Sequence, residues 1–250
     1  MEPGYQSVIV AARTAFFAQG LSFRVRGEEH VPKTGGAIMA INHTGYLDFL
    51  YAGLAARKSG RYVRFMAKKS IWSHRWAGKV MRSLKHIPVD RQAGVAAFQM
   101  AVQRLKDGEI VGVYPEATMS RSFEIKELKT GAVRMAQLAG VPILPTIVWG
   151  AQRVWTKDNP KNLKRSNIPI FVTVGEPFHI AKGENAKDAT LRLREVMRTM
   201  LDESIAAYPE MTGSDLAFLP ARFGGTAPTP EEAFAHDERD MKRTKDEFTD

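Results

Sequence analysis

Cysteine is absent from this 250-residue chain. Disulfides, thiolate metal ligands and cysteine nucleophiles are therefore excluded. The sequence also lacks any run that approaches the ~20 apolar residues of a membrane-spanning helix. The N-terminus lacks the short basic segment and uninterrupted apolar core of a secretory signal. We expect any contact with a membrane to be peripheral.

Several common catalytic signatures are missing as well. The sequence contains no G-x-S-x-G nucleophile elbow, no G-x-x-x-x-G-K-[ST] phosphate loop, no dinucleotide-binding G-x-G-x-x-G and no H-E-x-x-H zinc motif. Serine-hydrolase, nucleotide-hydrolysis and zinc-protease chemistry therefore have no support.

The charge of the chain is unevenly distributed. The net charge is +9, and residues 223–250 carry eight acidic and four basic side chains, so residues 1–222 carry +13. A basic charge of this size favours an anionic partner: phospholipid headgroups, nucleic acid, or phosphorylated and CoA-like small molecules. Solvated lysines on an ordinary basic protein would explain the charge equally well.

Short apolar runs bounded by Gly and Pro alternate with stretches of helical periodicity. This alternation predicts an α/β fold with a mostly parallel or mixed central sheet covered by helices. The predicted strands are Phe23–Arg26, Ala37–Asn42, Tyr62–Met66, Ile87–Asp90, Ile110–Tyr114, Ile143–Val148 and Phe171–Val174. The predicted helices cover 46–57, 71–84, 92–107, 130–139 and 186–207.

We divide the chain into three parts. Residues 1–20 are predicted to hold an N-terminal amphipathic helix, because apolar side chains recur at helical spacing from Tyr5 to Phe16. Residues 21–208 form the α/β domain. Residues 209–250 lose this periodicity and are predicted to be a mobile, partly disordered C-terminal tail.

The predicted helix 71–84 combines tryptophans with basic residues. Trp72, Trp76, Val80 and Leu84 would share one face, with arginine and lysine beside it. Such a face suits an anionic lipid interface, although a stripe of this kind more often packs into a core. Our hypothesis is that 5–19 and 71–84 together form a membrane-docking face.

His43 follows the predicted strand Ala37–Asn42 and precedes a predicted helix that carries Asp48 in its first turn. With His43 on the loop, the Asp48 carboxylate can reach one ring nitrogen and hold the imidazole in one tautomer. The other nitrogen is then free to take a proton from an alcohol. By itself, a histidine and an aspartate at this spacing arise easily by chance.

Three further clusters accompany this pair. Residues 86–91 end in Arg91, which suits a phosphate or an ion pair with Asp90. Residues 113–122 contain Glu116, Thr118 and Arg121, which suit a polyol phosphate or a capped turn. The prolines of 141–145 indicate shape and not chemistry. The His43 pair and the first two of these clusters follow strands, where α/β sheets place their ligands.

These four segments resemble the glycerolipid acyltransferase family, which includes the 1-acylglycerol-3-phosphate acyltransferases. The family's N-H-x4-D, I/V-x-R, F-P-E-G-T-R-S and V-P-x-x-P blocks correspond to Asn42–Asp48, Ile87–Arg91, Tyr114–Ser122 and Val141–Pro145, in the same order. The resemblance covers about residues 20–180. It includes the lysine segment Phe65–Lys69 and the helix start Leu128–Ala132.

The resemblance implies a direct transfer without a cofactor or a metal. His43, oriented by Asp48, would deprotonate the free hydroxyl of lysophosphatidate, which would attack the thioester of acyl-CoA or acyl-carrier protein. Backbone amides near Gly45 or in the third block would stabilise the oxyanion. The residues implied to hold the acceptor are Arg91, Arg121 and Lys68 at the phosphate, with Glu116 and Thr118 at the glycerol.

The resemblance also implies a peripheral protein on the cytoplasmic face of an anionic phospholipid membrane, with no nucleic-acid partner. Two departures concern the third block. Ala117 stands where the family has glycine, a small change if the backbone φ there is negative. Met119 stands where the family has arginine, which arrives only at Arg121.

Two other functions stay open at this point. The acceptor can be glycerol 3-phosphate, another lysophospholipid or a glycolipid. The chain can also be a non-catalytic basic protein that binds lipid or nucleic acid.

Overall fold

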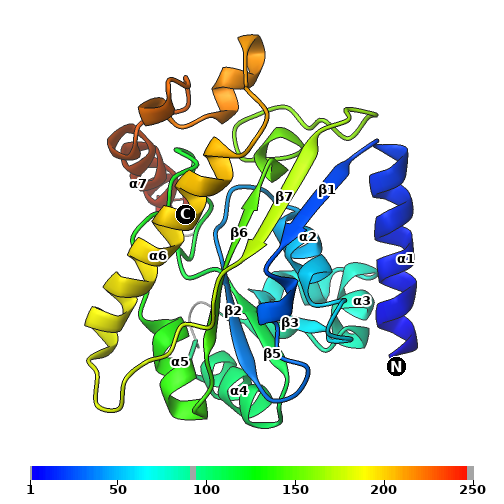
Figure 1. Cartoon of the computed structure of the whole chain (residues 1–250), viewed down its shortest axis with the longest axis vertical. Coiled ribbons are helices and arrows are strands. Elements are labelled where there is room, and N and C mark those ends of the chain that lie inside the picture. The colour runs from blue at the N-terminus through cyan, green and yellow to red at the C-terminus, as the bar shows by residue number, and fades with distance from the viewer. Residues whose placement is uncertain (1, 91–93, 247–250) are drawn as a thin grey trace.

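The computed structural model describes residues 2–90 and 94–246 and contains one seven-stranded sheet, ordered β1–β7–β6–β2–β5–β3–β4 (Figure 1). Among the described strand pairs, β6–β7 is antiparallel and the others are parallel. The predicted mixed α/β sheet is confirmed, and each predicted strand ends within two residues of the observed one. The strands are β1 (Ser22–Arg26), β2 (Ala37–Ile41), β3 (Val63–Lys68), β4 (Ile87–Val89), β5 (Ile110–Val113), β6 (Ile143–Trp149) and β7 (Pro169–Val174).

Helices cover both faces of the sheet. One core contains side chains of α4 (Gly94–Lys106), α5 (Gly131–Ala139) and α6 (Ala186–Ala206). The opposite core contains side chains of α1 (Pro3–Ala18) and α2 (Asp48–Ala55). Across residues 2–90 and 94–246, every helix is too short or too polar to cross a bilayer.

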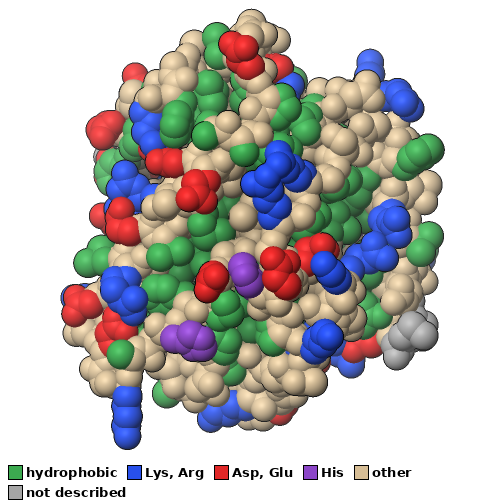
Figure 2. All heavy atoms as spheres, viewed as in Figure 1, with side chains coloured by type: hydrophobic (Ala, Val, Ile, Leu, Met, Phe, Trp, Pro, Cys, Tyr) green, Lys and Arg blue, Asp and Glu red, His purple; other side chains and the backbone are tan. Residues whose placement is uncertain are grey.

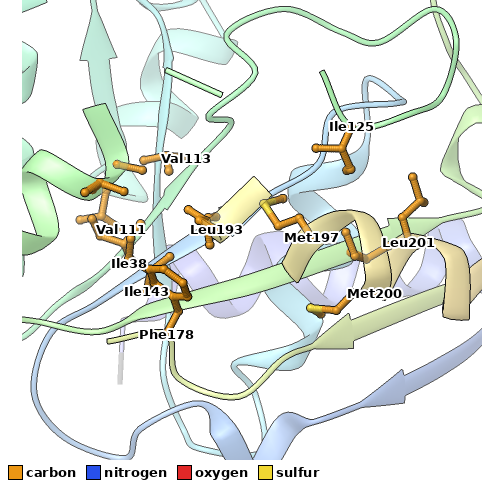
Figure 3. Close-up of a cluster of buried hydrophobic side chains, with 14 of the residues drawn as sticks. Ile38, Val111, Val113, Ile125, Ile143, Phe178, Leu193, Met197, Met200 and Leu201 are labelled. Carbon is orange, nitrogen blue, oxygen red and sulfur yellow. The ribbon is translucent and has the colours of Figure 1, made fainter. Parts of the chain in front are cut away.

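The position of β2 at the centre of the sheet explains why its sequence is apolar throughout. All five of its residues are buried, because both faces of the strand are covered. Ile38 and Ala40 belong to one core, and Met39 and Ile41 belong to the other, as the alternation of a strand requires. Figure 3 shows the first core, in which side chains of α6 lie over those of the strands.

The predicted helix 71–84 is wrong as a single element. It is divided into the 3₁₀ helix η2 (Lys69–Ser73) and α3 (Ala77–Ser83). The chain turns so tightly that a Cβ on Gly78 would lie 2.2 Å from the Trp72 carbonyl oxygen. The four apolar residues consequently do not form one stripe: Leu84 is buried, whereas Trp76 is 68% exposed.

The segment after α6 contains the 3₁₀ helices η4 (Gly213–Phe218) and η5 (Ala221–Phe223), followed by α7 (Pro230–Asp246). The prediction of a mobile tail therefore misses regular structure in its described part. A capping box starts α7: the Thr229 amide donates to Glu232 Oε2 (2.9 Å), and the Glu232 amide donates to Thr229 Oγ1 (3.3 Å). Ala227 and Ala233 are buried against the domain.

Candidate active site

The carboxyl ends of β2, β5 and β3 lie at one edge of the sheet, because these three strands are parallel neighbours. His43 follows β2, and Tyr114 follows β5. The Asn42 side chain prolongs the sheet at this edge. Its Nδ2 donates to the Val148 carbonyl oxygen (3.1 Å), and its Oδ1 accepts from the Val148 amide (2.7 Å). Asn42 thus fixes the backbone immediately before His43.

His43 and Asp48 form the pair expected from their spacing. His43 Nδ1 lies 3.1 Å from Asp48 Oδ2. The same oxygen accepts the amides of Thr44 and Gly45, each at 2.9 Å. The loop therefore wraps around a fully buried carboxylate, which favours the tautomer of His43 with its proton on Nδ1, toward Asp48.

These hydrogen bonds also correct one expectation about the oxyanion. The Gly45 amide already donates to Asp48, so it is not free to stabilise a developing negative charge. Glycine suits this position for another reason. A Cβ there would lie 3.1 Å from the Ala151 carbonyl oxygen, closer than most contacts of a real Cβ atom.

Burial and hydrogen bonds act in opposite directions on the Asp48 carboxyl. Burial raises the pKa of the Asp48 carboxyl, and the hydrogen bonds from His43, Gly45 and Thr44 oppose this rise. The His43 ring stacks on the Tyr114 ring, with centroids 4.1 Å apart. The imidazole is thus supported on one side, and its side chain keeps 20% of its surface exposed to solvent.

Glu116 connects the third block to His43. Its Oε1 accepts the His43 amide (2.9 Å), and its Oε2 accepts the Lys126 amide (3.0 Å). Burial raises the pKa of Glu116 to about 7, against the effect of these two amides. Since both oxygens are bonded to the backbone, Glu116 shapes the loop around His43 in this structure.

Ala117 adopts a left-handed conformation with φ of 63°. The condition of a negative φ is therefore not met, and the replacement of the family's glycine is not a small change. An alanine in this region is strained because its Cβ approaches the neighbouring backbone. The turn that the sequence places after Glu116 therefore carries a local energetic cost.

Arg121 is buried among carboxylates. Its Nε lies 2.5 Å from Asp158 Oδ2, and its two terminal nitrogens bind Asp237 and Asp240 of α7. Lys126 also binds Asp237 (2.5 Å), and Lys157 also binds Asp240 (2.7 Å). Arg121 is thus engaged by this chain's own carboxylates.

The other predicted ligands of the acceptor differ in position. The exposed Lys68 ends β3, two strands from β2, which corresponds to about 10 Å at ordinary strand spacing. Thr118 is exposed, and its hydroxyl accepts from Lys126 Nζ (2.8 Å). Arg91 lies outside the described residues. In the described part of the chain, no group of three or more His, Asp or Glu side chains is arranged to hold a metal ion.

The chain is similar to known proteins at the level of a family model, of individual relatives and of a solved structure. The family model described as Acyltransferase matches residues 22–149, which span the strands β1 to β6 and the whole His43 loop. The chain belongs to this acyltransferase family.

The chain is also similar in sequence to individual acyltransferases. The 1-acyl-sn-glycerol-3-phosphate acyltransferase of Bacillus subtilis (strain 168) is 30% identical over 159 residues, which cover 63% of this chain and 74% of the relative. A probable enzyme of the same name from Mycoplasma pneumoniae is 26% identical over 197 residues, 73% of each chain.

A solved structure supports the fold of the acyltransferase. The crystal structure of the 1-acyl-sn-glycerophosphate acyltransferase from Thermotoga maritima superposes with a TM-score of 0.62 at 21% identity. The alignment covers 79% of this chain and 78% of that one. At this identity the likeness concerns the fold alone.

Several residues around the site were not predicted from the sequence. Tyr114 is the first residue after β5, and its position beside His43 can be read from the parallel register of β2 and β5. Lys126 and Lys157 carry no local signal, because they reach the site through long loops. Asp237 and Asp240 lie in the segment predicted to be mobile.

Proposed function

We propose that this acyltransferase moves a fatty acyl group from acyl-CoA or acyl-carrier protein to the free hydroxyl of 1-acylglycerol 3-phosphate, with His43 as general base. The observation that carries this proposal is the His43–Asp48 pair, in which Asp48 occupies Nδ1 and Nε2 has no hydrogen-bond partner among the described residues. The names of the relatives in Bacillus subtilis and Mycoplasma pneumoniae support the same acceptor.

The transfer proceeds without an acyl-enzyme. His43 Nε2 takes the proton of the acceptor hydroxyl as the oxygen attacks the thioester carbonyl carbon. The C–S bond breaks when the tetrahedral intermediate collapses, and the protonated imidazole supplies a proton to the leaving sulfur. Asp48 stabilises the imidazolium in between, because its buried carboxylate contacts Nδ1.

The test of this reaction is product formation. Purified protein is incubated with lysophosphatidate and palmitoyl-CoA, and free CoA and phosphatidate are measured together. A panel of acceptors follows, containing glycerol 3-phosphate, other lysophospholipids and a glycolipid, each with CoA and carrier-protein donors. Phosphatidate formed at the highest rate supports the proposal, and a faster reaction with another acceptor contradicts its substrate.

We also propose that the enzyme acts peripherally at the cytoplasmic face of an anionic membrane. Trp76 is 68% exposed, and Arg75 and Lys79 lie over its ring at 5.7 and 5.6 Å. Phe17 of α1 is 82% exposed. Figure 2 shows hydrophobic side chains at the surface along the edge formed by α1, with basic side chains close by. Exposed aromatic and basic side chains together favour anionic interfaces.

Vesicle flotation tests this surface. We expect Trp76→Glu to weaken binding to vesicles that contain phosphatidylglycerol by about tenfold, because a charge replaces an inserting ring. Phe234→Glu is a matched control, since Phe234 is 61% exposed on α7, outside the proposed face. Unchanged binding of Trp76→Glu, also after Trp72→Glu is added, would rule this surface out.

A further inference from the structure

Three cations meet two carboxylates of α7 at a single place beside the strand edge. Arg121 and Lys157 both bind Asp240, at 2.6 and 2.7 Å. Arg121 and Lys126 both bind Asp237. The Arg121 side chain is only 6% exposed, so this cluster is a buried ion-pair network and not a chance pairing at the surface.

The two carboxylates match a phosphate monoester in charge. Asp237 and Asp240 are three residues apart, so they project from one face of α7. Together they carry two negative charges, and a phosphate monoester carries about −1.5 to −2 at neutral pH. Arginine also binds phosphate through paired hydrogen bonds, as it binds carboxylates. A phosphate can therefore replace both carboxylates with little change in local charge.

This cluster is joined to the base by hydrogen bonds. Lys126 donates from Nζ to the Thr118 hydroxyl and from its backbone amide to Glu116. Glu116 in turn accepts the amide of His43. An anion held by the cluster would thus lie on the loop that surrounds His43.

The described attachment of α7, through residues 230–240, is mostly electrostatic. Among the side chains described for residues 230–240, Ala233 alone is buried, and Phe234 is 61% exposed. The Lys157 ammonium and the Arg121 guanidinium hold the pKa of Asp240 well below its ordinary value, so this carboxylate is ionised at neutral pH. An element with so few buried apolar contacts opens at low free-energy cost when its ion pairs are replaced.

We propose that Arg121, Lys126 and Lys157 form a binding site for a phosphate monoester, which Asp237 and Asp240 of α7 occupy until such a ligand displaces the helix. This inference rests on the proposed function, because the acceptor named there carries a phosphate monoester. The helix then competes with the acceptor. The measured affinity for the acceptor is the intrinsic affinity multiplied by the fraction of molecules in which α7 has left the site.

Hydrogen exchange of the full-length protein tests the displacement directly. Exchange in 230–240 is followed with glycerol 3-phosphate, lysophosphatidate micelles, lysophosphatidylcholine micelles and phosphatidylglycerol vesicles, with α6 as an internal control. Both monoesters should accelerate exchange in 230–240 by about fivefold or more, and lysophosphatidylcholine should not. Unchanged exchange with both monoesters overturns the proposal, and so does acceleration by phosphatidylglycerol vesicles alone, which would assign the cluster to a lipid surface.

Kinetics of charge variants tests the competition. Asp237→Asn combined with Asp240→Asn should lower KM for lysophosphatidate by about fivefold or more and leave kcat unchanged. Glu231→Gln combined with Glu238→Gln is the matched control, because it removes the same charge from exposed positions of α7. An equal KM in both variants overturns the competition.

The two experiments separate this inference from the proposed function. If the wild-type protein does not acylate lysophosphatidate, the proposed function fails, and exchange with glycerol 3-phosphate still decides whether the cluster binds a phosphate monoester. If the double Asn variant does not fold, the exchange measurement on the wild-type protein decides in its place.

Discussion

His43 and Arg121 lie on neighbouring loops at the same edge of the sheet, yet the structure holds them by different kinds of partner. The imidazole is fixed by Asp48, five residues away, and the Thr44 and Gly45 amides bind the same carboxylate oxygen. The guanidinium is fixed by three carboxylates that are 37, 116 and 119 residues away.

This difference separates a rigid part of the site from an exchangeable part. The His43 ring is held by Asp48 at the start of α2 and by the Tyr114 ring after β5, so its orientation is set before any ligand arrives, as the proposed general-base role requires. Two partners of Arg121 belong to α7, in which Ala233 is the only buried side chain among the described residues 230–240. A competing anion can replace them without disturbing the sheet.

The largest effect on turnover is expected when Asp48, in the rigid part of the site, loses its negative charge. Asp48→Asn removes the carboxylate that stabilises the imidazolium in the proposed mechanism, and we expect kcat to fall by about 10²–10⁴-fold. CoA release measures the rate. Asp188→Asn, at an exposed position of α6, controls for the substitution itself. Wild-type turnover in Asp48→Asn would show that His43 works without an oriented partner.

The Glu116 side chain is hydrogen-bonded to both loops, so its protonation affects the stability of both. Burial raises its pKa from 4.5 to about 7, so the folded protein binds a proton between these pH values that the unfolded chain does not. The free energy of unfolding should therefore fall as pH rises from 4.5 to 7.

Denaturant titrations across this range measure the effect. In Glu116→Gln this part of the pH dependence should disappear, and the loss of one amide acceptor should cost about 1–3 kcal/mol at low pH. The same pH dependence in both proteins would mean that the two amides keep the carboxylate ionised throughout.

The smallest of these effects concerns the turn at Ala117. Ala117→Gly relieves the left-handed strain and should raise the free energy of unfolding by about 1 kcal/mol. Ala117→Val should lower it, because a β-branched side chain tolerates positive φ least. Thermal and chemical unfolding measure both. A glycine variant less stable than the natural protein would contradict the strain at this turn.

The same comparison explains how much was predictable from the sequence. The strands were predicted because short apolar runs between glycines and prolines require burial on both faces. The His43–Asp48 contact was predicted because five residues of a loop entering a helix limit where the carboxylate can lie.

The remainder depended on long-range packing or on a local signal that was overlooked. No short-range pattern connects Arg121 to Asp237, since 116 residues separate them. The break in 71–84 comes from the close approach of Gly78 to the Trp72 carbonyl, which periodicity does not reveal. The start of α7 was readable, because Thr229 and Glu232 form a capping box with proline at the first helical position.

The most direct test of His43 as the base is the turnover of His43→Ala with lysophosphatidate and palmitoyl-CoA. His179→Ala, an exposed histidine, is the matched control, and thermal unfolding verifies that both variants are folded. We predict that phosphatidate formation by His43→Ala falls by about 10²–10⁴-fold and that His179→Ala keeps the wild-type rate. A folded His43→Ala variant with the wild-type rate would contradict the role of His43.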